Sequence, residues 1–530
     1  LRPEHVIGMQ GEVRLRPEGM TNLKLKTGEI EVVVDEYRLL NTSLTPPFQV
    51  EADVDAGENL RLRYRFLDLR RPNIFQNLLR RHHAAQAVRQ YLNDSGFLEV
   101  ETPVLTRSTP EGARDYLVPS RLNPGKFYAL PQSPQLFKQL LMMAGFDRYY
   151  QIVKCYRDED LRADRQPEFT QIDMEMAFVN EEQIFRITEE LLKNLFEKVL
   201  GHKLEIPFPR LTYDEAIARY GTDKPDTRFG MELVDVTPVF ANSNFRVFAR
   251  LIEAGGTVKA LNLKGQAILP RSDLDKMQGK DNLANHYNVQ TGAQGVAWIK
   301  VQENNWQGPV AKNLSGSEKD LLAKTAGLEP GDLILFAAGE SKVVNPTLDI
   351  IRGHFGHRLN LLDDKKYSFT WITHFPLLEY DIAEKRYVAV HHPFTAPAEH
   401  DLEILAAQPE KVRSRAYDLV LNGNEIGGGS IRIHDHDLQQ QVFKALGIDK
   451  DEAQHKFGFM LDALKYGAPP HGGIALGFDR LVMLICGADS NRDVIAVPKT
   501  QKAACPMTQA PESVSLEQLL ELSLKLDLPG

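Results

Sequence analysis

Arginines, carboxylates and an aromatic ring are concentrated in residues 151–178, where their spacing could serve chemistry on a charged substrate. Side chains of a β-strand point alternately to opposite faces, so a strand over residues 169–178 would carry one polar face. That face would hold Phe169, Gln171, Asp173 and Glu175. A charged loop, residues 157–165, precedes it. These residues alone fit two interpretations, a binding site for a charged substrate or a solvated hairpin whose charges pair with one another.

A second group of candidate residues surrounds three consecutive glycines at 427–429. Glycines in a strand leave no side chain to pack, so we expect them to let a flat ligand approach the backbone between Glu425 and Arg432. Asp418 is a candidate partner of Glu425 for holding a cation. The two differ in strand parity, so a bulge or twist is needed to direct both side chains at one ion.

The predicted elements around these groups would position further charge. A helix over residues 136–143 places Lys138 in its first turn, where a cation opposes the helix dipole and suggests an anionic substrate. A glycine-rich strand in residues 472–480 enters an apolar helix with Arg480 at its start. The polar loop 109–115 could act as a lid. The pair of histidines at 391 and 392, taken alone, is more often structural or exposed than catalytic.

The first 54 residues predict β-structure, with strands over 6–13 and 28–34. Two or three strands bury little core, so we expect a fragment of a small barrel whose beginning is missing, and a transit peptide stays undecided. Residues 61–71 follow with five arginines. They could pair with Asp68 as a solvated linker or contact phosphate as a hinge, and we favour the phosphate-contacting hinge.

A helix is predicted over residues 73–94, followed by a strand over 97–105. Pro103 lacks a backbone donor, so this strand should lie at an edge or an interface. Residues 229–362 then change in character, with short strands and helices and no catalytic constellation, which predicts an inserted α+β domain.

Composition limits the number of domains and the class of protein. The 530 residues predict about three or four domains, and the net charge of −9 argues against a generally basic nucleic-acid coat while allowing a locally basic face. Three cysteines without CxxC spacing argue against a disulfide scaffold or a zinc site and favour a reducing cytosol. No apolar run approaches the roughly 20 residues of a membrane span.

These motifs together resemble those of the class II aminoacyl-tRNA synthetases, and among them the bacterial-type aspartyl-tRNA synthetases, over essentially the whole chain. The strand ending at Pro103 is similar to motif 1, Arg157 and Glu159 to the Arg-x-Glu of motif 2, and residues 477–480 to motif 3. Three longer strings are more specific: QSPQLFK at 132–138, RQPEFTQID at 165–173 and GGGSIR at 427–432.

The resemblance implies an α+β multidomain fold with an antiparallel catalytic sheet, a partial N-terminal OB-fold β-barrel of the anticodon-reading kind, and an inserted α+β domain of the GAD type. The implied domains are the incomplete OB-fold over residues 1–54, an arginine-rich hinge over 55–72, a first catalytic segment over 73–228, the insert over 229–362, and a second catalytic segment with a C-terminal extension over 363–530. The first OB-fold strands would be absent, so anticodon recognition is expected to be lacking. Motif 1 implies a homodimer formed through the strand around Pro103.

The implied reaction has two steps: L-aspartate attacks the α-phosphate of ATP, and aspartate then passes to the terminal ribose of tRNA(Asp), with tRNA(Asn) left open. The implied catalytic residues are Arg157 and Arg480, and Asp418 with Glu425 would hold Mg²⁺. The implied aspartate-binding residues are Glu111, Ser133, Gln135, Lys138, Arg157, Asp173, His391 and Arg432. The implied ATP-binding residues are Arg157, Asp158, Glu159, Gln166, Phe169, Glu425, Gly477, Phe478, Asp479 and Arg480.

In this scheme Lys138 and Arg432, supported by His391, face the side-chain carboxylate of the substrate. Asparagine would leave two cations under-neutralised, which predicts strong discrimination. The alternatives are an asparaginyl- or lysyl-tRNA synthetase, a non-catalytic tRNA-binding paralogue, and an OB-containing RNA-binding protein. We expect a bacterial cytoplasmic enzyme without membrane association.

Overall fold

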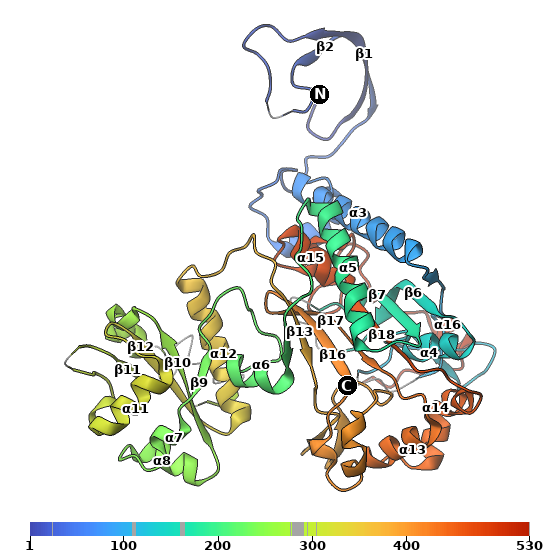
Figure 1. Ribbon diagram of the computed structural model, residues 1–530. Coiled ribbons are helices and arrows are strands. Elements are labelled where there is room, and N and C mark those ends of the chain that lie inside the picture. The colour runs from blue at the N-terminus through green and yellow to red at the C-terminus, as the bar shows by residue number, and fades with distance from the viewer. Residues whose placement is uncertain are drawn as a thin grey trace. The chain divides into compact units, whose positions relative to one another are not determined.

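The computed structural model describes residues 1–23, 25–108, 113–159, 165–275, 277, 291–293, 295–303 and 305–528. By its contacts the chain forms two compact units, Leu1–Leu79 with Arg492–Ser513 and Arg80–Asn491 with Val514–Gly530 (Figure 1). Helix α3 (Pro72–Asp94) begins in the first unit and continues in the second.

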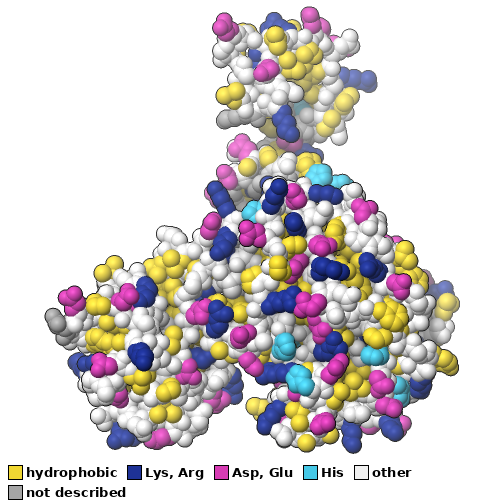
Figure 2. Space-filling model, viewed as in Figure 1, with side chains coloured by type: hydrophobic (Ala, Val, Ile, Leu, Met, Phe, Trp, Pro, Cys, Tyr) yellow, Lys and Arg dark blue, Asp and Glu magenta, His cyan; other side chains and the backbone are white. Residues whose placement is uncertain are grey.

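The smaller unit contains an antiparallel strand pair, β1 (Val6–Leu15) and β2 (Ile30–Asn41), which confirms the β-structure predicted for this segment. Both strands carry exposed apolar side chains, including Val13 and Leu39, and Figure 2 shows hydrophobic side chains on the surface of this pair. Two strands alone bury little apolar area.

The arginine-rich segment is folded into two short helices, α1 (Glu58–Arg63) and α2 (Arg65–Asp68). Arg65 is 1% exposed; it pairs with the buried Asp68 and donates to the carbonyl oxygens of Arg492 and Ile495 at 2.7 and 2.9 Å. Arg71 pairs with the same carboxylate at 2.9 Å. The prediction of phosphate contact is therefore wrong for Arg65 and Arg71, because a buried carboxylate and nearby carbonyls already satisfy them.

The larger unit is built on an eight-stranded sheet (Figure 1). In spatial order its strands are β3 (Leu98–Glu99), β6 (Arg148–Tyr156), β7 (Glu168–Ala177), β18 (His471–Gly477), β17 (Asn424–Ile431), β16 (Ala416–Leu421), β13 (Phe369–Thr373) and β8 (Arg210–Thr212). Every pair from β6 to β13 is antiparallel, and the outermost pairs, β3 with β6 and β13 with β8, are parallel. The expected antiparallel sheet is thus confirmed in its centre. The edge position of the strand before Pro103 is also confirmed, although β3 is shorter than expected.

Several helices pack against this sheet. The helices α4 (Gln135–Met143) and α15 (Phe478–Cys486) contact β7, and α5 (Glu181–Leu200) contacts β18. Local sequence sets the ends of α5, because Asn180 and Gln183 form a capping box and Gly201 takes the left-handed conformation at the C-terminus. The other elements of this unit are α6 (Tyr213–Tyr220), α13 (His436–Ala445), α14 (Lys450–Leu464), α16 (Leu516–Glu521) and the strand pairs β4 (Leu117–Pro119) with β5 (Phe127–Ala129) and β14 (Leu378–Asp381) with β15 (Arg386–Ala389).

Aromatic packing joins α5 to the sheet. Trp371 on β13 is fully buried and stacks on Phe185 with ring centroids 4.3 Å apart. Its indole nitrogen donates to Glu189 Oε1 at 2.9 Å, so the polar end of the ring is satisfied as well. Trp371 is therefore a natural reporter of the integrity of this sheet.

Residues 229–362, the predicted insert, contain a second, antiparallel sheet (Figure 1). In spatial order its strands are β11 (Ala297–Lys300), β12 (Leu333–Gly339), β10 (Thr257–Leu263) and β9 (Leu233–Asp235). Apolar side chains of one face meet α12 (Ser341–Arg358), and those of the other meet α7 (Thr237–Phe240), α8 (Arg246–Glu253) and α11 (Gly316–Ala326). A short helix, α9 (Arg271–Asp275), also belongs to this segment. Buried clusters on both faces give this α+β segment a core of its own.

Candidate active site

One row of directly paired residues crosses the centre of the eight-stranded sheet. Asp173 on β7 pairs with Ala475 on β18, Ala475 with Gly428 on β17, and Gly428 with Asp418 on β16. Residues directly opposite in antiparallel strands point to the same face. Asp173 and Asp418 therefore share one face, three strand spacings or about 14 Å apart.

The predicted alternation along β7 places Glu175 on this face too. Asp173 is 1% exposed and Glu175 is fully buried, so the interpretation as a solvated hairpin fails for the residues that matter most. Burying two carboxylates two residues apart requires compensating cations, because a buried unpaired charge is very costly.

Two cations supply that compensation. Lys138 on α4 places its Nζ 2.7 Å from Asp173 Oδ1 and 3.3 Å from Glu175 Oε2. Arg432, which follows β17, donates to both oxygens of Glu175, from Nε at 2.9 Å and from Nη2 at 3.1 Å. Lys138 and Arg432 are thus brought together as predicted, but two carboxylates already balance them.

The carboxylates respond differently to this environment. Burial alone would raise the pKa of Glu175, but Arg432 and Lys138 outweigh it and lower the pKa to about 2. Burial raises the pKa of Asp173, against the attraction of Lys138. Asp173 Oδ2 is buried without a hydrogen-bond partner in the described part of the chain, so a substrate ammonium group could donate to it.

Glycines make room for these side chains within the sheet. A Cβ on Gly473 would lie 2.1 Å from Glu175 Oε2, and one on Gly428 would lie 2.3 Å from Asp418 Oδ1. The expectation that Gly428 leaves the backbone open to a flat ligand is therefore wrong, because a carboxylate from the neighbouring strand occupies that space.

His392 lies beside the cations and contributes no charge. Its Nδ1 accepts from the Phe394 amide at 3.2 Å, which leaves the ring proton on Nε2. Burial, reinforced by Arg432 and Lys138, lowers its pKa to about 3, so this imidazole is neutral at pH 7. It can donate one hydrogen bond without adding a third positive charge.

Arg157 follows β6, beside the same polar face. Its guanidinium lies over the Phe169 ring at 5.1 Å, and its buried Nε has no hydrogen-bond partner among the described residues. A desolvated donor of this kind suits an anionic ligand. Nearby, Glu159 pairs with Arg165 at 2.7 Å and Asp158 lies 3.8 Å from Arg114, both in partly exposed positions.

The remaining predicted residues of this region take supporting positions. Gln135 opens α4, is 7% exposed and donates to Gln139 at 3.1 Å. Ser133 Oγ accepts from the Gln135 amide, and Gln166 is 6% exposed. Glu111, predicted on a closing loop, lies outside the described residues.

The second acidic pair is formed by Asp418 and Glu425, and it required the predicted bulge. The β16–β17 register shifts between Leu419 and Val420, so that Glu425 faces Val420 while Gly428 faces Asp418. Asn422 and Gly423, both with positive φ, form the tight turn between the strands. Val420 lies two residues from Asp418 on the same face of β16, so the bulge directs Glu425 to the face of Asp418 despite their opposite parity.

His391 belongs to this acidic pair rather than to the cations at Lys138. Its Nε2 lies 3.1 Å from Asp418 Oδ1, and Asp418, despite the opposing effect of burial, raises the pKa of the imidazole. The expected support of the substrate side chain by His391 stays a prediction. Its buried Nδ1 has no partner among the described residues.

The start of α15 joins this pair to β7. Arg480 Nη1 donates to the carbonyl oxygen of Glu425 at 2.5 Å. The Asp479 carboxylate pairs with Arg81 at 2.6 Å and accepts from the Thr170 amide at 2.7 Å. Gly477 caps the helix and Phe478 is buried under Arg81.

Among the described residues no cluster of three or more His, Cys, Asp or Glu side chains could enclose a metal ion. Two carboxylates, Asp418 and Glu425, fit Mg²⁺ of the kind that arrives with a nucleotide, because such an ion takes most ligands from water and phosphate. A lysine ammonium lies against one of them: Lys224 Nζ is 2.7 Å from Glu425 Oε2. The carboxylate pair therefore already attracts one cation.

Sequence reasoning missed Glu175, His392, Lys224 and Arg81 as members of the site. Glu175 had a clear signal, since alternation put it on the same face as Asp173. Lys224 and Arg81 had none, because each reaches the site from a segment distant in sequence.

Figure 2 shows Lys and Arg interspersed with Asp and Glu over the visible face of the larger unit, without a broad field of one sign. Among the described residues no helix is both long and apolar enough to span a bilayer.

Comparison with known proteins agrees with this geometry. A relative named "Aspartate--tRNA(Asp/Asn) ligase" from Desulfatibacillum aliphaticivorans is 56% identical over 527 residues, covering 99% of this chain and 87% of its own length. A relative with the same name from Desulfotalea psychrophila is 57% identical over 528 residues, covering 99% and 86%. Asparaginyl-tRNA synthetase from Pyrococcus horikoshii, solved with asparaginyl-adenylate, shares the fold, with a TM-score of 0.54, 18% identity, and coverage of 94% of this chain and 83% of that one.

The family described as tRNA synthetases class II (D, K and N) matches residues 57–501, which include both acidic pairs and all the cations described above. The chain therefore belongs to the class II tRNA synthetases of the D, K and N group.

Proposed function

We propose that this chain activates L-aspartate with ATP and transfers the aspartyl group to tRNA(Asp). The observation that carries this proposal is the shared sheet face that joins a buried, charge-balanced cluster at Asp173 to an acidic pair at Asp418. A length of about 14 Å between them suits an amino acid and a triphosphate laid end to end. The names of the 56–57% identical relatives support the same reaction.

In the first step a carboxylate oxygen of aspartate forms a bond to the α-phosphorus, and the bond from that phosphorus to the pyrophosphate oxygen breaks. Arg157, whose buried Nε has no hydrogen-bond partner among the described residues, would hold the α-phosphate and the attacking carboxylate. Arg480 is assigned to the γ-phosphate, and Phe169 to stacking on adenine. In the second step the terminal ribose hydroxyl of tRNA attacks the aspartyl carbonyl carbon, and AMP leaves.

Selection of aspartate follows from the charge balance. Lys138 and Arg432 are offset by Asp173 and Glu175, and His392 is neutral, so the side-chain pocket itself has no net charge. Asparagine lacks the side-chain carboxylate that aspartate would place beside Lys138 and Arg432, so discrimination rests on the negative charge of that carboxylate within a balanced, buried cluster.

Asp418 and Glu425 are the residues that would hold Mg²⁺, which when bound supplies charge neutralisation of the triphosphate. His391 positions Asp418 through its 3.1 Å contact and could leave Nδ1 for the substrate. Glu111, Ser133, Gln135, Gln166 and the Asp158–Glu159 backbone complete the proposed substrate shell.

We further propose a homodimer through the sheet edge at β3, where Leu98, Val104 and Leu105 expose apolar side chains around Pro103. The β1–β2 pair is assigned to an OB-fold and the insert to the GAD type. We also propose charging of tRNA(Asn) as well as tRNA(Asp), which the names of the relatives support, and a cytoplasmic location.

The test is ATP–pyrophosphate exchange with aspartate, asparagine and lysine, followed by charging of tRNA(Asp) and tRNA(Asn) transcripts. Exchange should depend on aspartate and be lower by about 10³-fold or more with asparagine, as expected when a buried charge is left unpaired. Preference for asparagine or lysine would contradict the proposal. Tight tRNA binding without exchange would instead indicate a non-catalytic tRNA-binding protein.

A further inference from the structure

Lys224 lies outside every motif identified from sequence, yet its ammonium group is 2.7 Å from Glu425 Oε2. It belongs to the segment that follows α6 and leads into the insert. Its side chain is 44% exposed and that of Glu425 is 33% exposed, so this ion pair borders solvent. An exposed pair of this kind contributes little to folding, which leaves its position beside the proposed metal ligands to be explained.

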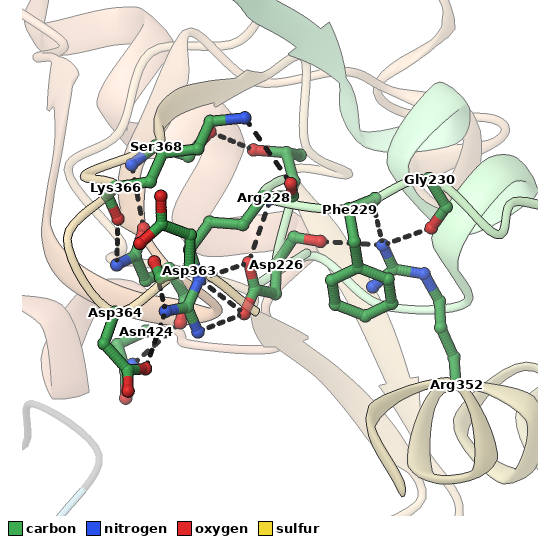
Figure 3. A network of polar contacts seen from close by, with 12 residues as sticks. Asp226, Arg228, Phe229, Gly230, Arg352, Asp363, Asp364, Lys366, Ser368 and Asn424 are labelled. Carbon is green, nitrogen blue, oxygen red and sulfur yellow. Dashed lines mark hydrogen bonds and ion pairs between the residues drawn. The ribbon is translucent and has the colours of Figure 1, made fainter. Parts of the chain in front are cut away.

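The segment that follows Lys224 is held by a network of polar contacts around Asp226 and Arg352 (Figure 3). Arg352 on α12, 1% exposed, donates to the carbonyl oxygens of Asp226, Phe229 and Gly230 at 2.7, 3.0 and 3.1 Å. Arg228 pairs with Asp226 at 2.7 Å. One buried guanidinium therefore fixes the chain from two residues beyond Lys224.

The same segment also touches the turn that carries Glu425. A Cβ on Gly423 would lie 3.2 Å from Asp226 Cβ, so these two segments of the chain are in close contact. Asn422 Oδ1 accepts a hydrogen bond from the Ser368 amide at 2.8 Å, and Asn422 Nδ2 donates to the Lys366 carbonyl oxygen at 2.9 Å. These bonds connect the turn to the segment that leaves the insert. The backbones on both sides of the Lys224–Glu425 pair are thus constrained, and the flexible element is the four-carbon stem of the lysine.

We propose that Lys224 is a displaceable counter-cation of the Asp418–Glu425 pair, which holds Glu425 in position before nucleotide and divalent metal bind and competes with that metal. The inference rests on the proposed metal ligands. An ammonium group 2.7 Å from Glu425 Oε2 occupies a direction from which a metal ion would approach, and two cations cannot share one carboxylate oxygen without strong repulsion. Lysine suits the task because its charge can turn into solvent while its backbone stays fixed. Lys224 is therefore a positioning residue, one that orients Glu425.

The test is Mn²⁺ binding to the full chain without ATP, measured by electron paramagnetic resonance of free Mn²⁺. In Lys224→Met the competing charge is gone, so the dissociation constant should fall by about twofold to fivefold, the range expected for a partly exposed charge pair. Lys224→Arg should stay near wild type. Lys203→Met, in which an 81% exposed lysine that pairs with Glu197 is changed, is the matched control and should show no effect.

Asp418→Asn and Glu425→Gln should each weaken Mn²⁺ binding, both alone and combined with Lys224→Met. An unchanged or weaker Mn²⁺ affinity in folded Lys224→Met, checked by circular dichroism, overturns the inference. Mn²⁺ binding that is unaffected by Asp418→Asn and Glu425→Gln also overturns it, as does the absence of detectable binding in every variant. Aspartate-dependent exchange by the wild-type chain is measured separately, so failure of the inference and failure of the proposed function are distinguishable.

Discussion

Glu175→Gln gives the sharpest test of the charge balance at the centre of the sheet. The carboxylate is fully buried, accepts two hydrogen bonds from Arg432, and lies 3.3 Å from the ammonium nitrogen of Lys138. Removing one partner of a buried ion pair costs about 3–5 kcal/mol, and glutamine keeps one carbonyl oxygen for Arg432, so we expect about 3 kcal/mol at pH 7. The lowering of the pKa from 4.5 to about 2 corresponds to a similar amount, about 3 kcal/mol.

The pH dependence follows from the direction of that shift. Between pH 4.5 and about 2 the unfolded state binds a proton at Glu175 that the folded state does not, so stability is present above this window and is lost as pH falls through it. The glutamine variant has no such proton to bind. The difference between wild type and Glu175→Gln should therefore shrink between about pH 5 and pH 3.

Trp371 makes the measurement local. The chain has three tryptophans, and changing Trp298 and Trp306, both in the insert, to phenylalanine leaves Trp371 as the reporter of the eight-stranded sheet. Urea unfolding would be followed by its fluorescence in this background. Glu182→Gln is the control, because Glu182 pairs with Arg210 at the surface with its side chain 67% exposed, and should cost at most about 1 kcal/mol. If Glu175→Gln were no more destabilising than this control at pH 7, or if its effect did not change with pH, the charge balance described here would be refuted.

Two substitutions probe the chemistry. Arg157→Ala should abolish aspartate-dependent pyrophosphate exchange, whereas Arg186→Ala, at an exposed position on α5, should not; exchange at the wild-type rate in Arg157→Ala would contradict the role of its buried guanidinium. Lys138→Ala or Arg432→Leu should lose activation of aspartate while equilibrium binding of ATP persists, and an unaltered dependence of exchange on aspartate concentration would count against the selection mechanism.

The charge balance also revises how selectivity is understood. From sequence, Lys138 and Arg432 looked like two free cations awaiting a carboxylate. In the structure Asp173 and Glu175 neutralise both. We therefore propose that selection of aspartate depends on the charge balance of the complete cluster.

Local patterns were sufficient for the elements and for much of the site. Alternation along β7 predicted one face that carries Phe169, Asp173 and Glu175, and the structure confirms that arrangement. Parity alone also showed that Asp418 and Glu425 would need a bulge, which the β16–β17 pair contains. Both predictions succeeded because strand geometry fixes the direction of side chains within a few residues.

What the sequence could not determine is which of these residues become buried against one another. Arg65 and Arg71 read as phosphate-binding arginines, because nothing local shows that Asp68 would be buried between them. Gly428 read as an opening for a ligand, although Asp418 of the neighbouring strand fills it.

Residue types, spacing and periodicity by themselves determined the class of fold, the motif residues and the face of each strand, since these depend on backbone geometry over short distances. Tertiary structure alone decided which charges neutralise one another, as for Lys138 with Glu175, His391 with Asp418 and Lys224 with Glu425. The physical reason is that electrostatic energy depends on distance and burial in space, and neither is encoded in the separation of two residues along the chain.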